Sequence, residues 1–331
     1  MIPPELSVTV LVPTYRRPDQ LRRCLAALSR QTRPPDQLVV VRRADDIGTR
    51  LALGDLAGLI DRPIDVVAVT EPGVVHALSS GMAVAFGDVV ALTDDDAEPR
   101  PDWLERLLSH YADGRVAAVG GLDVQPTSAT EVVAERVGVI EPWGRVVGRH
   151  HFGAPPARDV DHLRGVNMSA RRSWWRFDQR LRGIGAQYAF ELDTCLGVRS
   201  AGDRVVYDPA AAVDHAHAPR PDDEPRDEPG FDERLDRVHN ETYLLLKWLR
   251  APRALAALAY GLVVGTRAAP GPLLVVERLV AGQPPPEVAT NAAAGLLGRY
   301  LALATLICAA AQPAWRRERR RPRRDDTTAS V

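Results

Sequence analysis

The sequence predicts an α/β fold, in which a mostly parallel sheet with flanking helices is followed by a helical C-terminal region. Three observations support this prediction. Short apolar runs alternate with segments of helical periodicity over the first half of the chain, the acidic triplet Asp94, Asp95 and Asp96 directly follows one of those runs, and uncharged segments recur beyond residue 250. With 331 residues, of which 45% are hydrophobic and 26% charged, the chain can bury a large core as one large or two modest domains.

The elements of the first half follow one another in a regular order. Residues 8–12 form a β-branched apolar run that ends at Pro13, and Leu21, Leu25 and Leu28 then recur at helical spacing. The same reading continues with a strand at 38–41, a strand at 64–69, a helix of small residues at 74–86 and a strand at 89–92. Strands spaced in this way predict a mostly parallel sheet, whose ligands bind beyond the carboxyl ends of the strands.

Composition excludes several classes of protein. The three cysteines, Cys24, Cys195 and Cys308, are far apart and odd in number, so neither a disulfide framework nor a zinc cluster is indicated. The first seven residues show no secretory signal, and we expect a cytoplasmic protein. The formal net charge is −1, yet arginines crowd residues 316–324, so the rest of the chain is acidic. No aromatic residues are interleaved with these arginines, and nucleic acid is not an expected partner.

The acidic triplet predicts a metal site. Three adjacent carboxylates at the end of a buried strand repel one another unless a cation lies among them. Their hard oxygen atoms favour Mg²⁺ or Mn²⁺, and these ions usually arrive with a phosphate-bearing ligand. The alternative is a solvated acidic turn that caps a helix over residues 101–111. Tyr15, Arg16, Asp45 and Asp46 are expected at the same edge of the sheet.

Three segments together resemble a known family. They are VTVLVPTYRRPDQLRRCLAAL, EPGVVHALSSGMAVAFGDVVALTDDDAEPRPDWLERLL and FELDTCLGVRSAGDRVVYDPAAAVDH. In order and spacing they resemble the donor, metal and acceptor segments of the family 2 glycosyltransferases, which have the GT-A fold, and the resemblance covers roughly residues 7–217. It implies a hexosyltransferase-type enzyme that uses a nucleoside-diphosphate sugar and inverts the anomeric carbon.

The resemblance assigns the donor loop. Pro13, Thr14 and Tyr15 match the element that wraps the nucleotide base and ribose, and Arg16 stands where Asn is usual. Arg16 is expected either to pair with a phosphate or a local acid, or to face solvent at a helix entry. The second strand is followed by Asp45 and Asp46, downstream of the position where the family carries its base-binding acids. These two residues hold the base or form an Asx-turn.

The resemblance also assigns the metal ligands. The family pattern D-x-D maps onto Asp94, which would contact the ribose or the metal, and Asp96, which would bind the metal that bridges the diphosphate. Asp95 is a further donor-site candidate that could exchange roles with its neighbours. His215 matches an element that contacts the metal or the diphosphate, and Mn²⁺ or Mg²⁺ is the expected cofactor.

For the acceptor side, the resemblance places the catalytic base at Glu191, with Asp193 as second choice. Inverting transfer to a hydroxyl requires a carboxylate that removes its proton. The alternative is that both acids only complement a helix N-terminus. Asn167 is expected to bind donor or acceptor hydroxyls. Trp174 and Trp175 are expected either to stack on a sugar face or to pack in the core.

The predicted organisation has four parts. The first is a catalytic domain at 1–218, with a donor half to about 122 and an acceptor half from about 123. A linker or surface loop at 219–237, a helical region at 238–315 and a basic disordered tail at 316–331 follow it. The uncharged runs 254–266 and 300–315 are shorter than the roughly 20 residues that span a bilayer. They predict packed helices of a soluble cap, or helices in a membrane interface whose arginine flank meets anionic lipid.

The predicted function is therefore a metal-dependent inverting glycosyltransferase. Its acceptor would be a glycan, a lipid-linked molecule or a small molecule, as in polysaccharide and cell-envelope biosynthesis, and its location the cytoplasm or the cytoplasmic face of the membrane. Two alternatives stay open. A nucleotidyltransferase would require a Gly-rich, Lys-bearing phosphate loop after the first strand, and residues 13–17 do not supply one. A degenerate GT-A-like binding or scaffold protein at the membrane would keep the fold without turnover.

Overall fold

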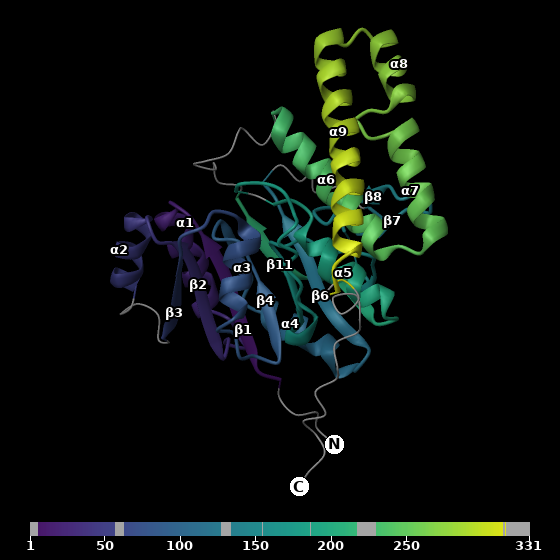
Figure 1. Ribbon diagram of the computed structural model, residues 1–331. Helices are drawn as coiled ribbons and strands as arrows, with labels where there is room; N and C mark the ends of the chain where they lie inside the picture. The colour runs from purple at the N-terminus through teal and green to yellow at the C-terminus, as the bar shows by residue number, and fades with distance from the viewer. Residues whose placement is uncertain are drawn as a thin grey trace.

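The computed structural model describes residues 6–56, 63–126, 134–153, 155–185, 187–216, 230–313 and 315. A nine-stranded mixed sheet runs through the centre of these residues, with helices on both of its faces (Figure 1). Its main path has the order β3-β2-β1-β4-β10-β6-β11-β5. The predicted α/β class is confirmed.

Four neighbouring parallel strands of the sheet come from residues 8–92. They are β1 (Val8–Thr14), β2 (Gln37–Arg43), β3 (Ile64–Val69) and β4 (Val89–Leu92). All three pairings among them are parallel. β3 and β4 begin and end where the sequence predicts them, because each is a β-branched run bounded by polar or turn residues.

Helices pack on both faces of this part of the sheet. α1 (Pro18–Ser29) lies on one face and α3 (Val74–Met82) on the other. α2 (Ile47–Leu56) packs beside α1, and α4 (Trp103–Ser109) packs on strands that follow later in the chain. Successive side chains of a strand point to opposite faces. Accordingly Val10 of β1 packs in one core with Leu25 of α1, while Leu11 packs in a second core with Leu78 of α3.

The second half of the sheet brings distant segments to the same edge. β10 (Met168–Arg171) lies antiparallel between β4 and β6 (Val116–Val124). The long strand β11 (Arg204–His215) runs parallel to β6 and antiparallel to the short strand β5 (Ala97–Pro99). This register sets His215 opposite Ala97, directly after the acidic triplet.

Shorter elements complete this half. They are the 3₁₀ turns His110–Ala112 and Arg172–Trp174, the strands β7 (Val139–Ile140), β8 (Val146–Val147) and β9 (Arg158–Asp159), and the helix α5 (Phe190–Ser200). β9 pairs with β11, and β7 pairs with β8 outside the main sheet.

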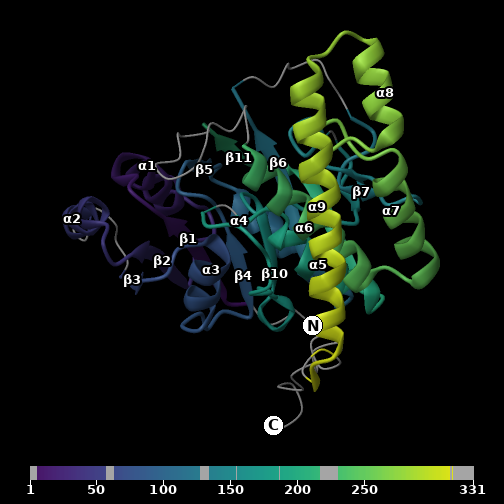
Figure 2. The same ribbon diagram turned by 45° about the horizontal axis from the view of Figure 1, so that its top comes forward.

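Four helices form the C-terminal region: α6 (Phe231–Trp248), α7 (Ala251–Val263), α8 (Pro272–Val280) and α9 (Pro285–Ala310). Leu192 of α5, Leu244 of α6 and Ala302 of α9 share one hydrophobic core. The region therefore packs directly on the acceptor half of the sheet domain. α8 and the adjoining end of α9 project away from the sheet (Figures 1 and 2).

The structure corrects two boundary predictions. α6 begins at Phe231, so residues 231–237 are helical and not part of a linker, and the rest of the predicted linker and the basic tail lie outside the described residues. α9 has 26 residues and a mean hydropathy of 1.6, so its length and composition would allow it to cross a membrane, with 33% of its most apolar window buried. The uncharged run predicted from the sequence begins only at residue 300, because Arg299 interrupts the apolar segment that forms α9. In the structure Arg299 is buried and donates to the carbonyl of Ala269 at 3.1 Å.

Candidate active site

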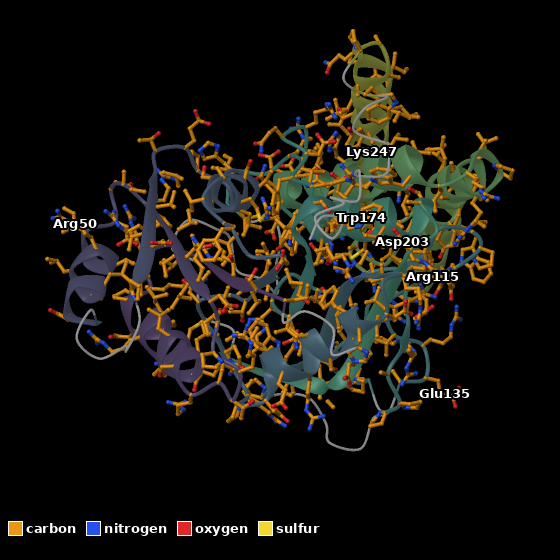
Figure 3. All side chains as sticks on the ribbon, turned by 90° about the horizontal axis from the view of Figure 1, so that it is seen from below. Arg50, Arg115, Glu135, Trp174, Asp203 and Lys247 are labelled. Atoms are coloured by element: carbon orange, nitrogen blue, oxygen red, sulfur yellow. The ribbon has the colours of Figure 1, made fainter. Side chains whose placement is uncertain are left out.

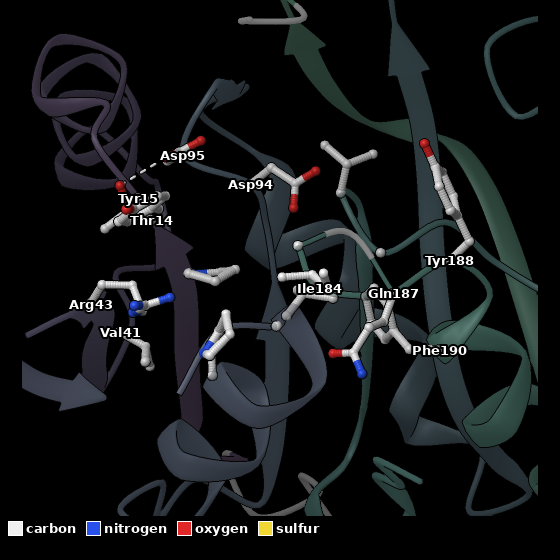
Figure 4. A pocket seen from close by; sticks show the side chains of 18 of the residues that line it. Thr14, Tyr15, Val41, Arg43, Asp94, Asp95, Ile184, Gln187, Tyr188 and Phe190 are labelled. Atoms are coloured by element: carbon white, nitrogen blue, oxygen red, sulfur yellow. Dashed lines mark hydrogen bonds between the residues drawn. The ribbon is translucent and has the colours of Figure 1, made fainter. Parts of the chain in front are cut away.

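A pocket of about 460 Å³ lies beyond the carboxyl ends of β1, β2, β3 and β4. Thr14, Tyr15, Val41 and Arg43 line one side, and Ile184, Gln187, Tyr188 and Phe190 line the other (Figure 4). Asp94 lies between the two groups in the same view. Glu191 and His215 also line the pocket. The location agrees with the rule for ligand sites in open sheets.

Asp94, Asp96 and His215 form a group suited to a cation. One ligand atom from each lies within 4.8 Å of the other two. The Nε2 atom of His215 is 3.2 Å from Oδ1 of Asp96. Two carboxylates and an imidazole are donors that Mn²⁺ accepts, so the residues fit the predicted metal.

Asp123 of β6 supports this group from behind. Its Oδ1 atom lies 2.9 Å from Nδ1 of His215, which turns the other ring nitrogen toward Asp96. Burial lowers the pKa of His215, but the hydrogen bonds to Asp123 and Asp96 and the charge of Asp94 raise it to about 9. The site therefore has an excess of negative charge that favours a cation.

Asp95 positions the donor loop. Its Oδ2 atom accepts a hydrogen bond of 2.8 Å from the Thr14 hydroxyl, and its Oδ1 atom lies 3.0 Å from Nη1 of Arg17. The same Arg17 nitrogen lies 3.3 Å from Oδ2 of Asp96. Burial raises the pKa of Asp95 to about 6, although Arg17 opposes this shift. Asp95 thus ties the end of β1 to the end of β4.

The loop after β1 presents Tyr15 to the pocket and Arg16 to solvent. Pro13, Thr14 and Tyr15 line the pocket as predicted from their position, and Arg16 is exposed and is not part of the lining. The Arg16 backbone has φ = 53°, and its guanidinium carbon lies 4.9 Å above the Tyr15 ring. Arg16 is exposed, and Arg17 is a cation that reaches the acidic triplet.

Asp45 and Asp46 do not line the pocket. Asp46 is buried and begins α2, because its Oδ1 accepts the Thr49 amide at 3.0 Å and its Oδ2 accepts the Thr49 hydroxyl at 2.6 Å. It also accepts the Arg16 amide at 2.5 Å. Asp45 is exposed beside Arg43. The Asx-turn interpretation applies, and the predicted base contact is corrected.

Glu191 faces the pocket from the first turn of α5. The helix begins directly after Ala189, whose φ of 69° is unusual for a residue with a Cβ and sets the direction of the first turn. Burial raises the pKa of Glu191, the charge of Asp94 adds to the rise, and Arg164 and Arg237 oppose it. A carboxylate with a raised pKa suits proton abstraction near neutral pH.

Asp193 has a different environment and is not the second candidate base. It is 1% exposed, and its Oδ1 atom accepts hydrogen bonds of 2.7 Å from Nζ of Lys247 and 2.7 Å from Nε1 of Trp248. Lys247 also contacts Asp178 at 2.8 Å. Because residues two apart in a helix point to different sides, Asp193 joins α5 to α6 while Glu191 faces the pocket.

The three predicted acceptor residues are buried in the sheet domain. Asn167 donates to the carbonyls of Leu122 at 3.0 Å and Ala211 at 2.9 Å, and it accepts the Trp103 indole N–H at 2.8 Å. Trp174 and Trp175 are buried and belong to a hydrophobic core. The core-packing alternative holds for the tryptophans, and the predicted acceptor contacts are corrected.

Sequence reasoning missed five residues of this site: Arg17, Asp123, Arg164, Tyr188 and Arg237. Arg17 lies within the first segment that carries the family resemblance, whereas the other four lie outside the three segments. Arg237 falls in the segment predicted as a linker, yet α6 carries it to the pocket. Leu235 and His239 are both buried and lie four residues apart, the spacing of one helix face. This spacing is the signal that could have revealed the helix.

Comparison with known proteins agrees with this geometry. Residues 9–149 match the family described as Glycosyl transferase family 2. The glucosyl-dolichyl phosphate glucuronosyltransferase of Haloferax volcanii is 28% identical over 226 residues, which are 63% of this chain and 69% of that protein. The pre-mycofactocin glycosyltransferase of Mycobacterium tuberculosis is 27% identical over 222 residues, and the aligned part is 44% of its length.

Solved structures share the fold. A mannosyltransferase from Pyrobaculum calidifontis in complex with GDP-Man and Mn²⁺ has a TM-score of 0.54 and 23% identity, covering 95% of this chain and 83% of that one. GalNAc-T7 with UDP, GalNAc and Mn²⁺ has a TM-score of 0.60 and 13% identity, covering 90% and 58% of the two chains. Residues 9–149 therefore match glycosyl transferase family 2, and the chain has the GT-A fold that these solved glycosyltransferases share.

Proposed function

We propose that the protein moves a sugar from a nucleoside-diphosphate sugar to an acceptor hydroxyl, with a divalent cation and with inversion at the anomeric carbon. The observation that supports this most strongly is that the acidic metal group and the Glu191 carboxylate line the same pocket. Donor and acceptor would therefore occupy adjacent places in one cavity. The acceptor would be a glycan, a lipid-linked molecule or a small molecule.

The metal site would be Asp94, Asp96 and His215, and the ion Mn²⁺ or Mg²⁺. A bound cation supplies electrostatic stabilisation of the departing diphosphate. His215 is held for this task by Asp123, and Asp96 by its contact with Arg17. The relatives that were solved with Mn²⁺ and with GDP-Man or UDP support this assignment of cofactor and donor class.

Glu191 would act as the catalytic base. It would accept the proton of the acceptor hydroxyl as the oxygen attacks the anomeric carbon from the side opposite the diphosphate. The base and ribose of the donor would lie against Pro13, Thr14 and Tyr15, with Arg43 above the Tyr15 ring at 5.4 Å. The departing group and the base would then lie on opposite sides of the sugar, as inversion requires.

Release of nucleoside diphosphate from UDP-, dTDP- and GDP-sugars, with Mn²⁺, Mg²⁺ or EDTA, tests the proposal. Slow hydrolysis of the donor gives a signal without a known acceptor. We expect metal-dependent release from one donor, abolished by Asp96→Asn and unchanged by Asp45→Asn, because Asp45 is outside the pocket. If no donor is hydrolysed or bound in a thermal-shift assay, the proposal fails in favour of a degenerate binding protein.

We also propose that the C-terminal helices dock on an anionic bilayer at the cytoplasmic face of the membrane. No residue of α8 is buried, and Leu273, Val276 and Val280 are 60%, 61% and 84% exposed. On α9, Leu296 and Ile307 are 62% and 70% exposed. The sequence after α9 carries seven arginines at 316–324, a charge that complements anionic headgroups.

Flotation with phosphatidylcholine vesicles, with and without phosphatidylserine, tests this docking. The triple change Leu273→Ser, Val276→Ser and Val280→Ser should abolish flotation with the anionic vesicles. Leu51→Ser is the matched control, because Leu51 is 61% exposed on α2, far along the chain from this surface. If the triple variant still floats with the anionic vesicles, lipid is not the occupant of this surface. The same conclusion follows if the triple change dissociates a dimer without an effect on flotation.

A further inference from the structure

Two arginines at the Glu191 end of the pocket have guanidinium groups that form no hydrogen bond or ion pair with the described residues. Arg164 precedes β10 and Arg237 lies on α6, and both line the pocket and are exposed. Among the residues that the structure describes, Arg164 forms no side-chain hydrogen bond or ion pair. The guanidinium carbon of Arg237 lies 5.3 Å from the centre of the Tyr188 ring, which leaves its N–H groups available.

The other arginines of the pocket are already engaged. Arg17 pairs with Asp95 and Asp96, and Arg42 donates to the carbonyl of Arg43 at 2.8 Å. Arg43 lies near Asp45, with 3.5 Å between Nε and Oδ1. Arg164 and Arg237 differ from these three arginines because, among the described residues, neither guanidinium group forms a hydrogen bond or an ion pair.

Both available arginines lie near Glu191, and Arg164 also lies near Asp123 behind the metal group. The charges of both act on the Glu191 carboxylate, which places them within electrostatic reach of it. Tyr15 and Val41 line the other side of the pocket (Figure 4). The hydroxyl that Glu191 would deprotonate must enter on the side of the two arginines.

We propose that Arg164 and Arg237 bind a phosphate group on the acceptor, so that the enzyme selects phosphorylated acceptors. This inference rests on the proposed function. Guanidinium groups bind phosphate through paired N–H donors, and two of them on different elements can clamp one phosphate. Ile184, which lines the same end and is 79% exposed, supplies an apolar surface for the rest of the acceptor.

The clamp also explains why the helical region belongs to the catalytic unit. Arg237 comes from α6, whose Asn240 donates to the carbonyls of Arg182 at 2.9 Å and Tyr188 at 3.1 Å. The segment that leads into Glu191 is therefore fixed by the same helix that supplies one of the two guanidinium groups. The sheet domain alone would lack half of the phosphate site.

Calorimetric binding of phosphorylated probes tests the inference. The probes are farnesyl phosphate and glucose 1-phosphate, with farnesol and glucose as the phosphate-free partners. At least one phosphorylated probe should bind the full-length protein, and its partner should not. Arg164→Gln and Arg237→Gln should each weaken that binding about 10-fold or more, because each removes charged hydrogen bonds to phosphate. Arg50→Gln on α2, at the edge of the molecule in Figure 3, is the matched control and should bind normally.

Donor hydrolysis, measured on the same variants, separates the possible outcomes. Unchanged KM for the donor, together with weakened binding of the phosphorylated probe, supports an acceptor site. A KM for the donor that rises in both variants would assign the arginines to the donor, for example to a sugar carboxylate, and would overturn the inference. Equal probe binding by all variants, or no binding of either phosphorylated probe, would also overturn it. Donor hydrolysis by the wild type remains the separate test of the proposed function.

Discussion

Glu191 and Asp193 show how strongly the environment of a carboxylate decides its role. Both lie in the first turn of α5, and their chemistry is nearly the same. Glu191 lines the pocket, whereas Asp193 contacts Lys247 and Trp248 in the interior. The first is therefore the candidate base, and the second is part of the connection between two helices.

Glu191→Gln and Asp193→Asn should have opposite consequences. The first should lower acceptor-dependent transfer by about 10²- to 10⁴-fold, the usual contribution of a general base, while donor binding and stability stay close to wild type. The second should lower the free energy of unfolding by about 3 kcal/mol or more, because the buried Lys247 loses a charged partner. Transfer rates and urea unfolding on both variants check this pair, and full transfer activity in Glu191→Gln would rule out this base.

The pH dependence of transfer should follow Glu191. Burial raises its pKa above the ordinary value, so kcat/KM should fall on the acid side at a higher pH than for an exposed glutamate. Arg164 and Arg237 lower this pKa, and Arg164→Gln or Arg237→Gln should therefore move the acid limb to still higher pH. If the fall of kcat/KM at acid pH does not move in either variant, protonation of Glu191 is not what causes that fall.

At the scale of elements, α6 connects the helical region to the catalytic apparatus. Lys247 bridges Asp178 and Asp193, all three side chains being nearly inaccessible, and the Tyr243 hydroxyl donates to Asp178 at 2.8 Å. Hydrogen bonds and opposite charges lower the pKa of Asp178 despite its burial. The network holds α5, and with it Glu191, against α6.

Lys247→Met should disrupt this connection. The substitution keeps the apolar stem but leaves the buried Asp193 without its cation and Asp178 with Arg180, which costs about 3–5 kcal/mol of unfolding free energy. Arg250→Met removes an exposed charge nearby and should stay within about 0.5 kcal/mol of wild type. Chemical denaturation of the two variants makes the comparison. Equal stability would mean that the network does not hold the helices together.

The same scale shows what the sequence could and could not predict. β3 and β4 were predictable to the residue because both are β-branched runs bounded by polar or turn residues, although only β4 is buried throughout and β3 is a largely exposed edge strand. The pairing register of β11 with β5 brings His215 to the metal group. The motif resemblance indicated this position of His215, whereas the local sequence pattern did not. The burial of Asn167 and Trp175 depends on packing among segments far apart in the chain, and Arg237 was hidden in a segment with the composition of a linker.

For the whole molecule, the sheet and the helical region together make one site. The sheet brings the acidic triplet, Asp123 and His215 to one edge, and α6 adds Arg237 and fixes the segment before Glu191. The apolar surface of α8 and α9 projects from the same helical region (Figure 2). A membrane-bound acceptor would thus approach from the side of the molecule that supplies the acceptor residues.

The central claim is that Asp94, Asp96 and His215 bind the divalent cation of the donor site, and Mn²⁺ titration followed by electron paramagnetic resonance tests it most directly. With a nucleoside diphosphate present, the wild type and Asp45→Asn should bind one Mn²⁺ with the same affinity. Asp96→Asn and His215→Gln should each bind it at least 10-fold more weakly, a loss of about 1.4 kcal/mol. Wild-type affinity for Mn²⁺ in both Asp96→Asn and His215→Gln would contradict the account.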